Sequence, residues 1–567
     1  MPLAATAVTA LVTDLRAIVG DRVSTAAAVR GHHSHGESWH AAAEPDAVVF
    51  PETTAEVSAI VRVCAAHRAP IVPFGIGSSL EGHVNAIHGG VSIDLTRMTK
   101  VLRLSADDMD VTVEAGLTHR ALNAHLKNSG LMFMVDPGAD ATIGGMTATR
   151  ASGTAAVRYG TMRETVLGLT VVLADGRVIT TGGRARKSSS GYDLTRLFVG
   201  SEGTLGVITE VTLRLYGRPE AISTAVCGFQ SMAGAATTVI ETIQLGVPVA
   251  RIEIIDEAQL AIVNRFSKTS LPEVPTLLFE FHGPSPAVVE EYARLVREVA
   301  DQHGVTSFQW TASPEERAKL WEARHNVLYA TIASRPGGKA WTSDICVPIA
   351  HLAECIVETQ ADLAAAQPVA PLVGHAGDGN FHLIFMLDPD DPEELARVAA
   401  ANHRLVERAL RFGGTCSGEH GVGMGKLKCP GARARRRRAR SHARHQAGGR
   451  SRPPDESRQA GAGHLTPASA PAPATAAGRE EGAQAGWRGQ GHVGLVGGAG
   501  RDGRLPPQAG ASRPLRQHGA QAVEAGLEAA AFPGADAQVE EAAQAARGGQ
   551  PARQMRGDGV FVAPDCR

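Results

Sequence analysis

Short apolar blocks and polar, glycine-rich turns alternate through the first half of the chain. Apolar blocks of this length fit β-strands, whereas the block over 54–67 has the spacing of a helix. Thr53 or Thr54 provides the N-cap of this helix, and Glu56 lies in its first turn. The pattern also predicts a helix over 118–129 with Thr118 as N-cap, and a lead-in helix over 8–30. The predicted strands are 47–51, 70–74, 91–95 and 111–116.

The strand over 70–74 runs directly into the Gly/Ser loop 75–82. A strand, helix, strand and glycine-rich loop in this order can point backbone N–H groups at a phosphate. More Gly, Ser and Thr residues follow at 136–146, 151–154 and 203–209, but no GxGxxG segment opens a helix, so this is not a Rossmann fingerprint. Two interpretations stay open at this point: a large cofactor lying across several loops, or a turn-rich α+β domain.

The second half of the chain carries longer elements. Residues 249–255 and 276–281 have the composition of strands, and 286–302 and 314–327 have the spacing of helices. They predict an antiparallel sheet with helices on one side.

Two glycine-bracketed turns hold the residues most suited to chemistry. Apolar runs flank the first turn, so 370–387 predicts a hairpin whose ends bring His375 and His382 together. The second turn, 418–423, adds Glu419 and His420. Two histidines and one glutamate suit a divalent metal with open positions, Zn or Mn, which leaves His420 as a candidate base. Each histidine alone is more often an ordinary loop residue; it is their grouping that favours chemistry.

Composition narrows the class of protein. The chain of 567 residues has a formal net charge of −2 and 4% aromatic residues, so nothing overall indicates a nucleic-acid partner. Its seven cysteines include no CxxC pair, which fits a reducing compartment and argues against a disulfide framework. The N-terminus lacks a basic region before its apolar residues, and no uncharged run is long enough to span a bilayer. These features predict a cytoplasmic protein with at most peripheral membrane contact.

Six segments resemble the FAD-linked oxidases of the vanillyl-alcohol oxidase type, in particular the FAD-binding oxidoreductase/transferase type 4 family. Within it, the resemblance points to the D-lactate dehydrogenases (cytochrome), with the glycolate oxidase flavin subunit and D-2-hydroxyglutarate dehydrogenase as near relatives. The match runs from about residue 23 to residue 428 in the order of the family. The segments are 73–77, 136–139, 158–163, 198–206, 374–382 and 418–423.

The resemblance implies an α+β fold in which a two-part, PCMH-type FAD-binding domain precedes an antiparallel-sheet cap domain that carries the substrate site. The implied divisions are a helical lead-in over 1–44, the FAD domain over 45–217, the cap over 218–410 and a return to the FAD domain over 411–428. FAD would bind to Pro73, Gly75, Ile76, Gly77, Ser78, Ser79, Asp136, Pro137, Gly138, Thr142, Gly144, Gly145, Ser152, Gly153, Tyr159, Glu202, Gly203, Gly206, Val207 and Ile208. One departure is Ala155, where the family has Asn; it predicts weaker packing near the cofactor.

The implied reaction is the oxidation of D-lactate or a related D-2-hydroxy acid to the 2-oxo acid, with hydride transfer to the flavin. Arg324 matches the family position whose arginine holds the substrate carboxylate, although a salt-bridged arginine is the simpler interpretation. His420 would act as base with a pKa near the working pH, and a metal on His375, His382 and Glu419 would polarise the hydroxyl. Cytochrome c, a quinone or an electron-transfer protein would accept the electrons, and a homodimer is left open. The alternatives are a glycolate oxidase flavin subunit, or an inactive flavin-fold remnant.

The composition changes abruptly after residue 428. A run of Arg and Ala over 432–440 is followed by Gly, Ala, Pro and Arg with few aliphatic residues, which predicts disorder over 429–567. A basic tail that binds nucleic acid or a membrane is one interpretation. The preferred hypothesis is a frameshift, because 446–460 read one nucleotide downstream permits the Asn-Pro-Gly-Lys ending of the family. The family segment lost in this way would pack beside His420, and its loss would weaken FAD binding.

Overall fold

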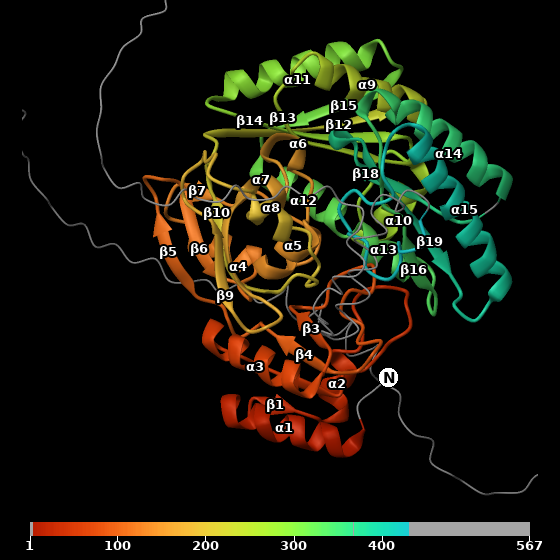
Figure 1. Ribbon diagram of the computed structural model, residues 1–567. Coiled ribbons are helices and arrows are strands. Elements are labelled where there is room, and N and C mark those ends of the chain that lie inside the picture. The colour runs from red at the N-terminus through yellow and green to blue at the C-terminus, as the bar shows by residue number, and fades with distance from the viewer. Residues whose placement is uncertain (1–3, 367, 430–567) are drawn as a thin grey trace, which may run out of the picture. The chain divides into compact units, whose positions relative to one another are not determined.

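The computed structural model describes residues 4–366 and 368–429 (Figure 1). The predicted disorder and the frameshift beyond residue 429 lie outside the described residues.

The first sheet has the strand order β1-β2-β4-β3. Its strands β2, β4 and β3 are parallel, and β1 pairs antiparallel to β2. Helices α1 and α3 pack on it through a core that includes Leu11, Ile60 and Ile93. Thr53 caps α3 by accepting a hydrogen bond from the N–H of Glu56, as predicted. The elements are α1 (Ala5–Val19), β1 (Val23–Ser24), α2 (Ala27–His32), β2 (Ala47–Val49), α3 (Thr54–His67), β3 (Ile71–Phe74) and β4 (Val91–Asp94).

The single lead-in helix predicted over 8–30 is wrong. Helix α1 ends before Gly20, whose combination of φ +60° and ψ −131° is readily adopted only by glycine. The chain then forms β1, in which Val23 pairs with Val49. Sheet pairing therefore overrides the helical periodicity here.

The second sheet has five antiparallel strands in the order β5-β6-β10-β8-β9. Short helices and a two-stranded β7/β11 ribbon accompany it. Thr118 caps α4, as predicted, and Thr142 caps α5. The elements are β5 (Val101–Ser105), β6 (Asp110–Glu114), α4 (His119–His125), β7 (Leu131–Met132), α5 (Ile143–Thr149), α6 (Ala156–Tyr159), α7 (Met162–Thr165), β8 (Val166–Val172), β9 (Val178–Gly182), α8 (Leu194–Phe198), β10 (Val207–Arg214) and β11 (Tyr216–Gly217).

The third sheet has eight strands, in the order β15-β12-β14-β13-β18-β19-β16, and β17 also pairs with β19. All its pairings are antiparallel, as predicted. We refer to the part of the chain built on this sheet as the cap. Its elements are β12 (Ala221–Phe229), α9 (Met232–Gln244), β13 (Val249–Ile255), α10 (Glu257–Ser267), β14 (Thr276–Gly283), α11 (Pro286–Asp301), β15 (Val305–Thr311), α12 (Pro314–His325), α13 (Val327–Ser334), β16 (Lys339–Thr342), β17 (Ile345–Cys346), η1 (Ile349–His351), α14 (Leu352–Ala366), β18 (Leu372–His375), η2 (Ala376–Asp378), β19 (Asn380–Leu387) and α15 (Pro392–Arg411).

Helices cover both faces of the cap sheet, so the prediction of helices on one side is wrong. Alternate residues of each strand point to opposite faces. Ile254 and Leu277 belong to the core under α9, α11, α14 and α15, whereas their neighbours Ile255 and Leu278 belong to a second core under α10, α12 and α13. Because Glu253, His375 and His382 are two residues from Ile255, Val373 and Ile384, they share this second face. The same face holds α12.

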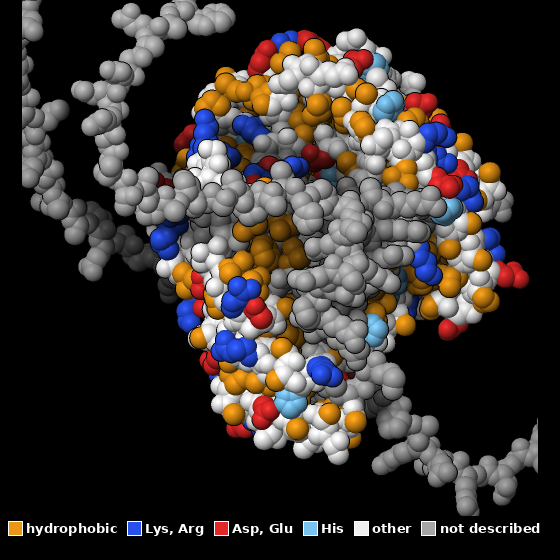
Figure 2. All heavy atoms as spheres, in the orientation of Figure 1, with side chains coloured by type: hydrophobic (Ala, Val, Ile, Leu, Met, Phe, Trp, Pro, Cys, Tyr) orange, Lys and Arg blue, Asp and Glu red, His pale blue; other side chains and the backbone are white. Residues whose placement is uncertain are grey.

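Side chains of opposite charge are mixed on the surface of α14 and α15 (Figure 2). Arg404 and Arg408 pair with Asp362, and Arg408 also pairs with Glu358. Among the described helices, none is long and apolar enough to cross a membrane.

Candidate functional site

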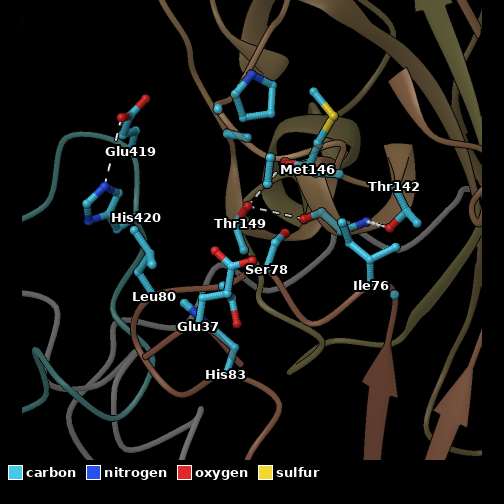
Figure 3. A pocket seen from close by; sticks show the side chains of 18 of the residues that line it. Glu37, Ile76, Ser78, Leu80, His83, Thr142, Met146, Thr149, Glu419 and His420 are labelled. Carbon is cyan, nitrogen blue, oxygen red and sulfur yellow. Dashed lines mark hydrogen bonds and ion pairs between the residues drawn. The ribbon is translucent and has the colours of Figure 1, made fainter. Parts of the chain in front are cut away.

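One cavity lies between loops of the first two sheets and the second face of the cap sheet. Loops 73–80, 136–145 and 151–154 line one part of it, and Arg324, His375, His382, Glu419 and His420 line another. Figure 3 shows Thr142 and Met146 on one side of this cavity and the neighbouring Glu419 and His420 on the other. The candidate catalytic residues and metal ligands predicted from the sequence therefore meet at one site.

The lining of this cavity fits a large cofactor held by backbone. Of the twenty predicted FAD-binding residues, all but Tyr159 and Val207 line it. A Cβ built on Gly138 would meet no atom within 4 Å, so the cavity extends beside this glycine. The hydroxyl of Ser79 is buried and has no hydrogen-bond partner within the described part of the chain. Such an orphaned donor at the cavity wall suits a polar group of a bound cofactor.

Tyr159 and Val207 lie outside the cavity lining. The phenol of Tyr159 is 2.7 Å from Nδ1 of His282, and this hydrogen bond ties α6 to β14 of the cap. Val207 begins β10 and packs in the core of the first sheet. Ala155, which departs from the family pattern, is fully buried, and its N–H donates a hydrogen bond to Asp136 Oδ1 at 3.4 Å.

Glu202 lines the cavity, but its carboxylate is engaged by protein groups. It accepts hydrogen bonds from the backbone N–H groups of Val422 and Gly423, both at 2.9 Å, and lies 3.0 Å from His83 Nε2. Glu202 therefore fastens the turn that follows His420.

His375, His382 and Glu419 form a cluster whose ligand atoms lie within 4.8 Å of one another. Oε1 of Glu419 is 3.0 Å from Nε2 of His375 and 3.3 Å from Nε2 of His382. The hairpin brings both rings to one face of the sheet. His382 pairs with Val373, which lies two residues before His375 on the neighbouring strand. A tetrahedral ion with ligand bonds of about 2.1 Å separates its ligand atoms by roughly 3.4 Å. The two distances to Glu419 Oε1 are close to that value.

Hydrogen bonds on the far side of each ring fix which nitrogen faces the cluster. Nδ1 of His375 donates to Glu253 Oε1 at 2.7 Å, and Nδ1 of His382 donates to the carbonyl of Ser343 at 3.0 Å. Each Nε2 then points at an acceptor-only carboxylate oxygen, so a positive charge is required between them, either a proton or a metal ion. Burial alone would lower the pKa of His375, but the carboxylates of Glu253 and Glu419 hold it well above its usual value. The donor set fits a divalent metal.

His420 stacks on His382, with ring centroids 4.9 Å apart and an angle of 8° between the rings. Its Nε2 is 3.9 Å from Glu419 Oε1, and its Nδ1 is 3.9 Å from Glu81 Oε1. Burial lowers the pKa of His420 to about 3. The side chain is therefore neutral at neutral pH, as a base must be, but its pKa is lower than the near-neutral one expected from the sequence.

Arg324 is a buried, salt-bridged arginine that also lines the cavity. Its Nε and Nη2 donate to Oε2 of Glu253 at 2.8 and 2.5 Å. These bonds use two of the five N–H groups of the guanidinium, so the others can donate to a ligand. Both sequence interpretations of Arg324, ion pair and anion anchor, are thus compatible.

Asp344 organises the turn that carries Glu419 and His420. Its Oδ2 accepts from the backbone N–H groups of Glu419 and His420, at 3.1 and 2.9 Å, and from Nζ of Lys426 at 3.0 Å. Lys426 also contacts Glu81 at 2.8 Å. Burial alone would raise the pKa of Asp344, but the positive charge of Lys426 holds it well below its usual range.

Sequence reasoning missed Glu253 and Asp344 as members of the site. One signal for Glu253 was available: Arg251 and Glu253 alternate with apolar residues in a strand that is otherwise apolar. A charged residue at such a position is buried and needs a partner. No comparable signal existed for Asp344, because its partners lie 36 to 82 positions further along the chain.

Two family models match the chain. The FAD binding domain matches residues 45–182, and the C-terminal domain of FAD linked oxidases matches residues 218–433.

Several relatives cover most of the described part of the chain. A "Probable D-lactate dehydrogenase, mitochondrial" of Danio rerio is 50% identical over 424 residues, which is 74% of this chain and 85% of that protein. The "D-lactate dehydrogenase [cytochrome], mitochondrial" of Arabidopsis thaliana is 46% identical, and the match covers 74% of each chain. The glycolate oxidase subunit GlcD of Bacillus subtilis is 35% identical over 68% of this chain and 82% of that protein.

The fold has relatives among solved structures. The 4-ethylphenol oxidase from Gulosibacter chungangensis superposes with a TM-score of 0.63 at 18% identity, over 78% of this chain and 94% of that chain. This confirms the α+β class with a PCMH-type FAD-binding fold.

The predicted cytoplasmic location is wrong. The relatives from Danio rerio and Arabidopsis thaliana are mitochondrial proteins, which contradicts it. The prediction depended on the lack of a recognisable secretory signal and membrane span, and neither observation identifies a compartment. At this level of identity and coverage, the chain belongs to the family of FAD-linked oxidases that includes the D-lactate dehydrogenases, and it is an FAD-dependent oxidoreductase.

Proposed function

We propose that this protein oxidises D-lactate, or a closely related D-2-hydroxy acid, to the corresponding 2-oxo acid. The observation that carries the proposal is that one cavity is lined by an arginine, a neutral histidine, a two-histidine, one-glutamate cluster and the FAD-binding loops. The names of the relatives from Danio rerio and Arabidopsis thaliana support D-lactate as the substrate.

FAD and the divalent metal would have separate tasks and separate binding residues. Bound FAD supplies the hydride acceptor, and the predicted loops that line the cavity would hold it. His375, His382 and Glu419 would hold a divalent metal, Zn or Mn, which supplies a Lewis acid for the substrate hydroxyl.

The side chains of this protein perform the remaining tasks. Free N–H groups of Arg324 donate to the substrate carboxylate and orient the acid. His420 accepts the hydroxyl proton at Nε2, the nitrogen on the side of Glu419. The C2 hydrogen leaves with its electron pair as hydride, so the substrate loses one proton and one hydride, which together are two protons and two electrons. Val373 and Ile384 line the same cavity with apolar surface and exclude water from the reacting atoms.

Anaerobic mixing tests the proposal. Purified protein is mixed with D-lactate while the flavin absorbance near roughly 450 nm is followed, with L-lactate and glycolate as controls. We expect bleaching with D-lactate alone. Faster bleaching with glycolate would support the glycolate oxidase alternative, and a flavin that no 2-hydroxy acid bleaches would support the inactive remnant.

The electron acceptor is proposed from the name of the Arabidopsis relative, which points to cytochrome c. Turnover with D-lactate and either cytochrome c or a soluble quinone distinguishes the two acceptors. Reduction of the quinone alone would overturn the assignment of cytochrome c.

We also propose that the residues after about 429 are translated out of frame. The match to the C-terminal family model ends at residue 433, which supports this view. Sequencing the gene across codon 428 tests it, and a frame-restored chain should retain more FAD. An uninterrupted frame whose codons exclude the alternative ending would contradict it.

A further inference from the structure

Glu253 is a fully buried carboxylate between two groups with different tasks in the proposed reaction. It lies on β13, where it pairs across the sheet with His375 on β18. Its Oε1 accepts from Nδ1 of His375 at 2.7 Å, and its Oε2 accepts from Nε and Nη2 of Arg324 at 2.8 and 2.5 Å. One buried side chain thus connects the candidate metal ligand to the candidate anchor of the substrate carboxylate.

The substrate class makes this connection useful. In a 2-hydroxy acid the hydroxyl and the carboxylate are on adjacent carbons, so their separation is nearly fixed. The residues that bind them must keep a matching separation. Glu253 sets it, because each of its oxygens orients one partner and both oxygens belong to one planar group. Both oxygens of Glu253 accept hydrogen bonds, one from His375 and the other from Arg324.

We propose that Glu253 is a positioning residue that orients His375 for metal binding and Arg324 for binding of the substrate carboxylate. The inference rests on the proposed function, since it assigns the distance between two of its binding groups. Two donors face Glu253, and only a carboxylate offers each of them an oxygen. A glutamine offers one oxygen and one NH₂ group, so Glu253→Gln must leave either His375 or Arg324 facing a donor.

A purely structural role is the competing explanation, because a buried carboxylate also neutralises buried cations. Glu280 provides the matched control. It is buried in the same sheet on β14, lies 2.8 Å from His282 Nε2 and 3.5 Å from Arg251 Nε, and does not line the cavity. Glu280→Gln therefore removes a charge from a similar Arg–carboxylate–His arrangement whose partners are Arg251 and His282 rather than Arg324 and His375.

The test uses the full chain and four measurements on wild type, Glu253→Gln and Glu280→Gln. They are Tm, FAD content, the dissociation constants of Zn²⁺ and Mn²⁺ by chelator competition, and kcat and KM for D-lactate. We expect both variants to lower Tm. We expect only Glu253→Gln to weaken metal binding, by about 10–100-fold, and to raise KM by about tenfold. Glu253→Asp keeps the charge but is one methylene shorter, so it should lose metal affinity with a smaller change in Tm.

Three results would overturn the inference. If Glu253→Gln and Glu280→Gln lower Tm alike and both keep the metal dissociation constant and KM of wild type, Glu253 is structural. If Glu253→Gln weakens neither metal binding nor substrate binding while Glu253→Asp unfolds the chain, the conclusion is the same. If wild type binds neither Zn²⁺ nor Mn²⁺, the proposed metal site is wrong, and the inference fails with it. The first two results leave the proposed function intact.

Discussion

Replacing Asp344 by alanine should release the turn that carries Glu419 and His420. Asp344 is ionised and almost fully buried, and it accepts backbone hydrogen bonds from both residues at 3.1 and 2.9 Å. Hydrogen bonds to a charged group contribute about 1.5–3 kcal/mol each. The two together therefore stabilise the turn by roughly 3–6 kcal/mol, apart from the ion pair with Lys426.

Hydrogen exchange measures this opening directly. At about 1.4 kcal/mol per factor of ten, backbone amides in a peptide over 412–429 should exchange about 10²–10⁴ times faster in Asp344→Ala. Asp344→Asn retains one carbonyl oxygen and should show a smaller acceleration. Peptides from α11, which packs on β12 and β14 of the cap, are the internal reference. Unchanged protection over 412–429 would refute the role assigned to Asp344, and equal acceleration everywhere would show global rather than local destabilisation.

Three further predictions concern single residues. Burial raises the pKa of Asp256 to about 7. This group therefore stabilises the folded state below about pH 4 and loses that contribution as the pH rises to about 7. Urea titrations at several pH values should show that Asp256→Asn removes a pH-dependent part of the free energy of unfolding, of at most about 4 kcal/mol. Gly421→Ala places a Cβ 2.9 Å from Glu202 Oε1 at a φ of +83°, and should cost about 1–2 kcal/mol and lower kcat more than FAD content; an unchanged kcat would contradict this. Gly144→Ala places a Cβ 2.6 Å from that of Ala115, and should lower the FAD content measured after gel filtration; full retention would show that α5 can shift without loss of the cofactor.

Local features of the sequence predicted most elements and part of the site. Thr53 and Thr118 cap their helices because a side-chain oxygen and a free backbone N–H lie three residues apart. The hairpin over 370–387 forms because two apolar runs flank a glycine-rich turn, and it brings His375 and His382 together. These features depend on neighbours along the chain, so the sequence by itself determines them.

The tertiary structure alone decided which carboxylate serves which cation. Glu253 meets His375 because β13 and β18 are neighbours, and it meets Arg324 because α12 covers the same face of the sheet. The order of strands and the face covered by a helix follow from the packing of whole elements. A charged residue in a strand does not indicate which strand or helix will lie beside it. The turn that carries Glu419 is likewise held in place by Asp344 and Glu202, which lie 75 and 220 residues from their partners Glu419 and Val422. Buried charge makes such partners obligatory, and only the folded chain selects them.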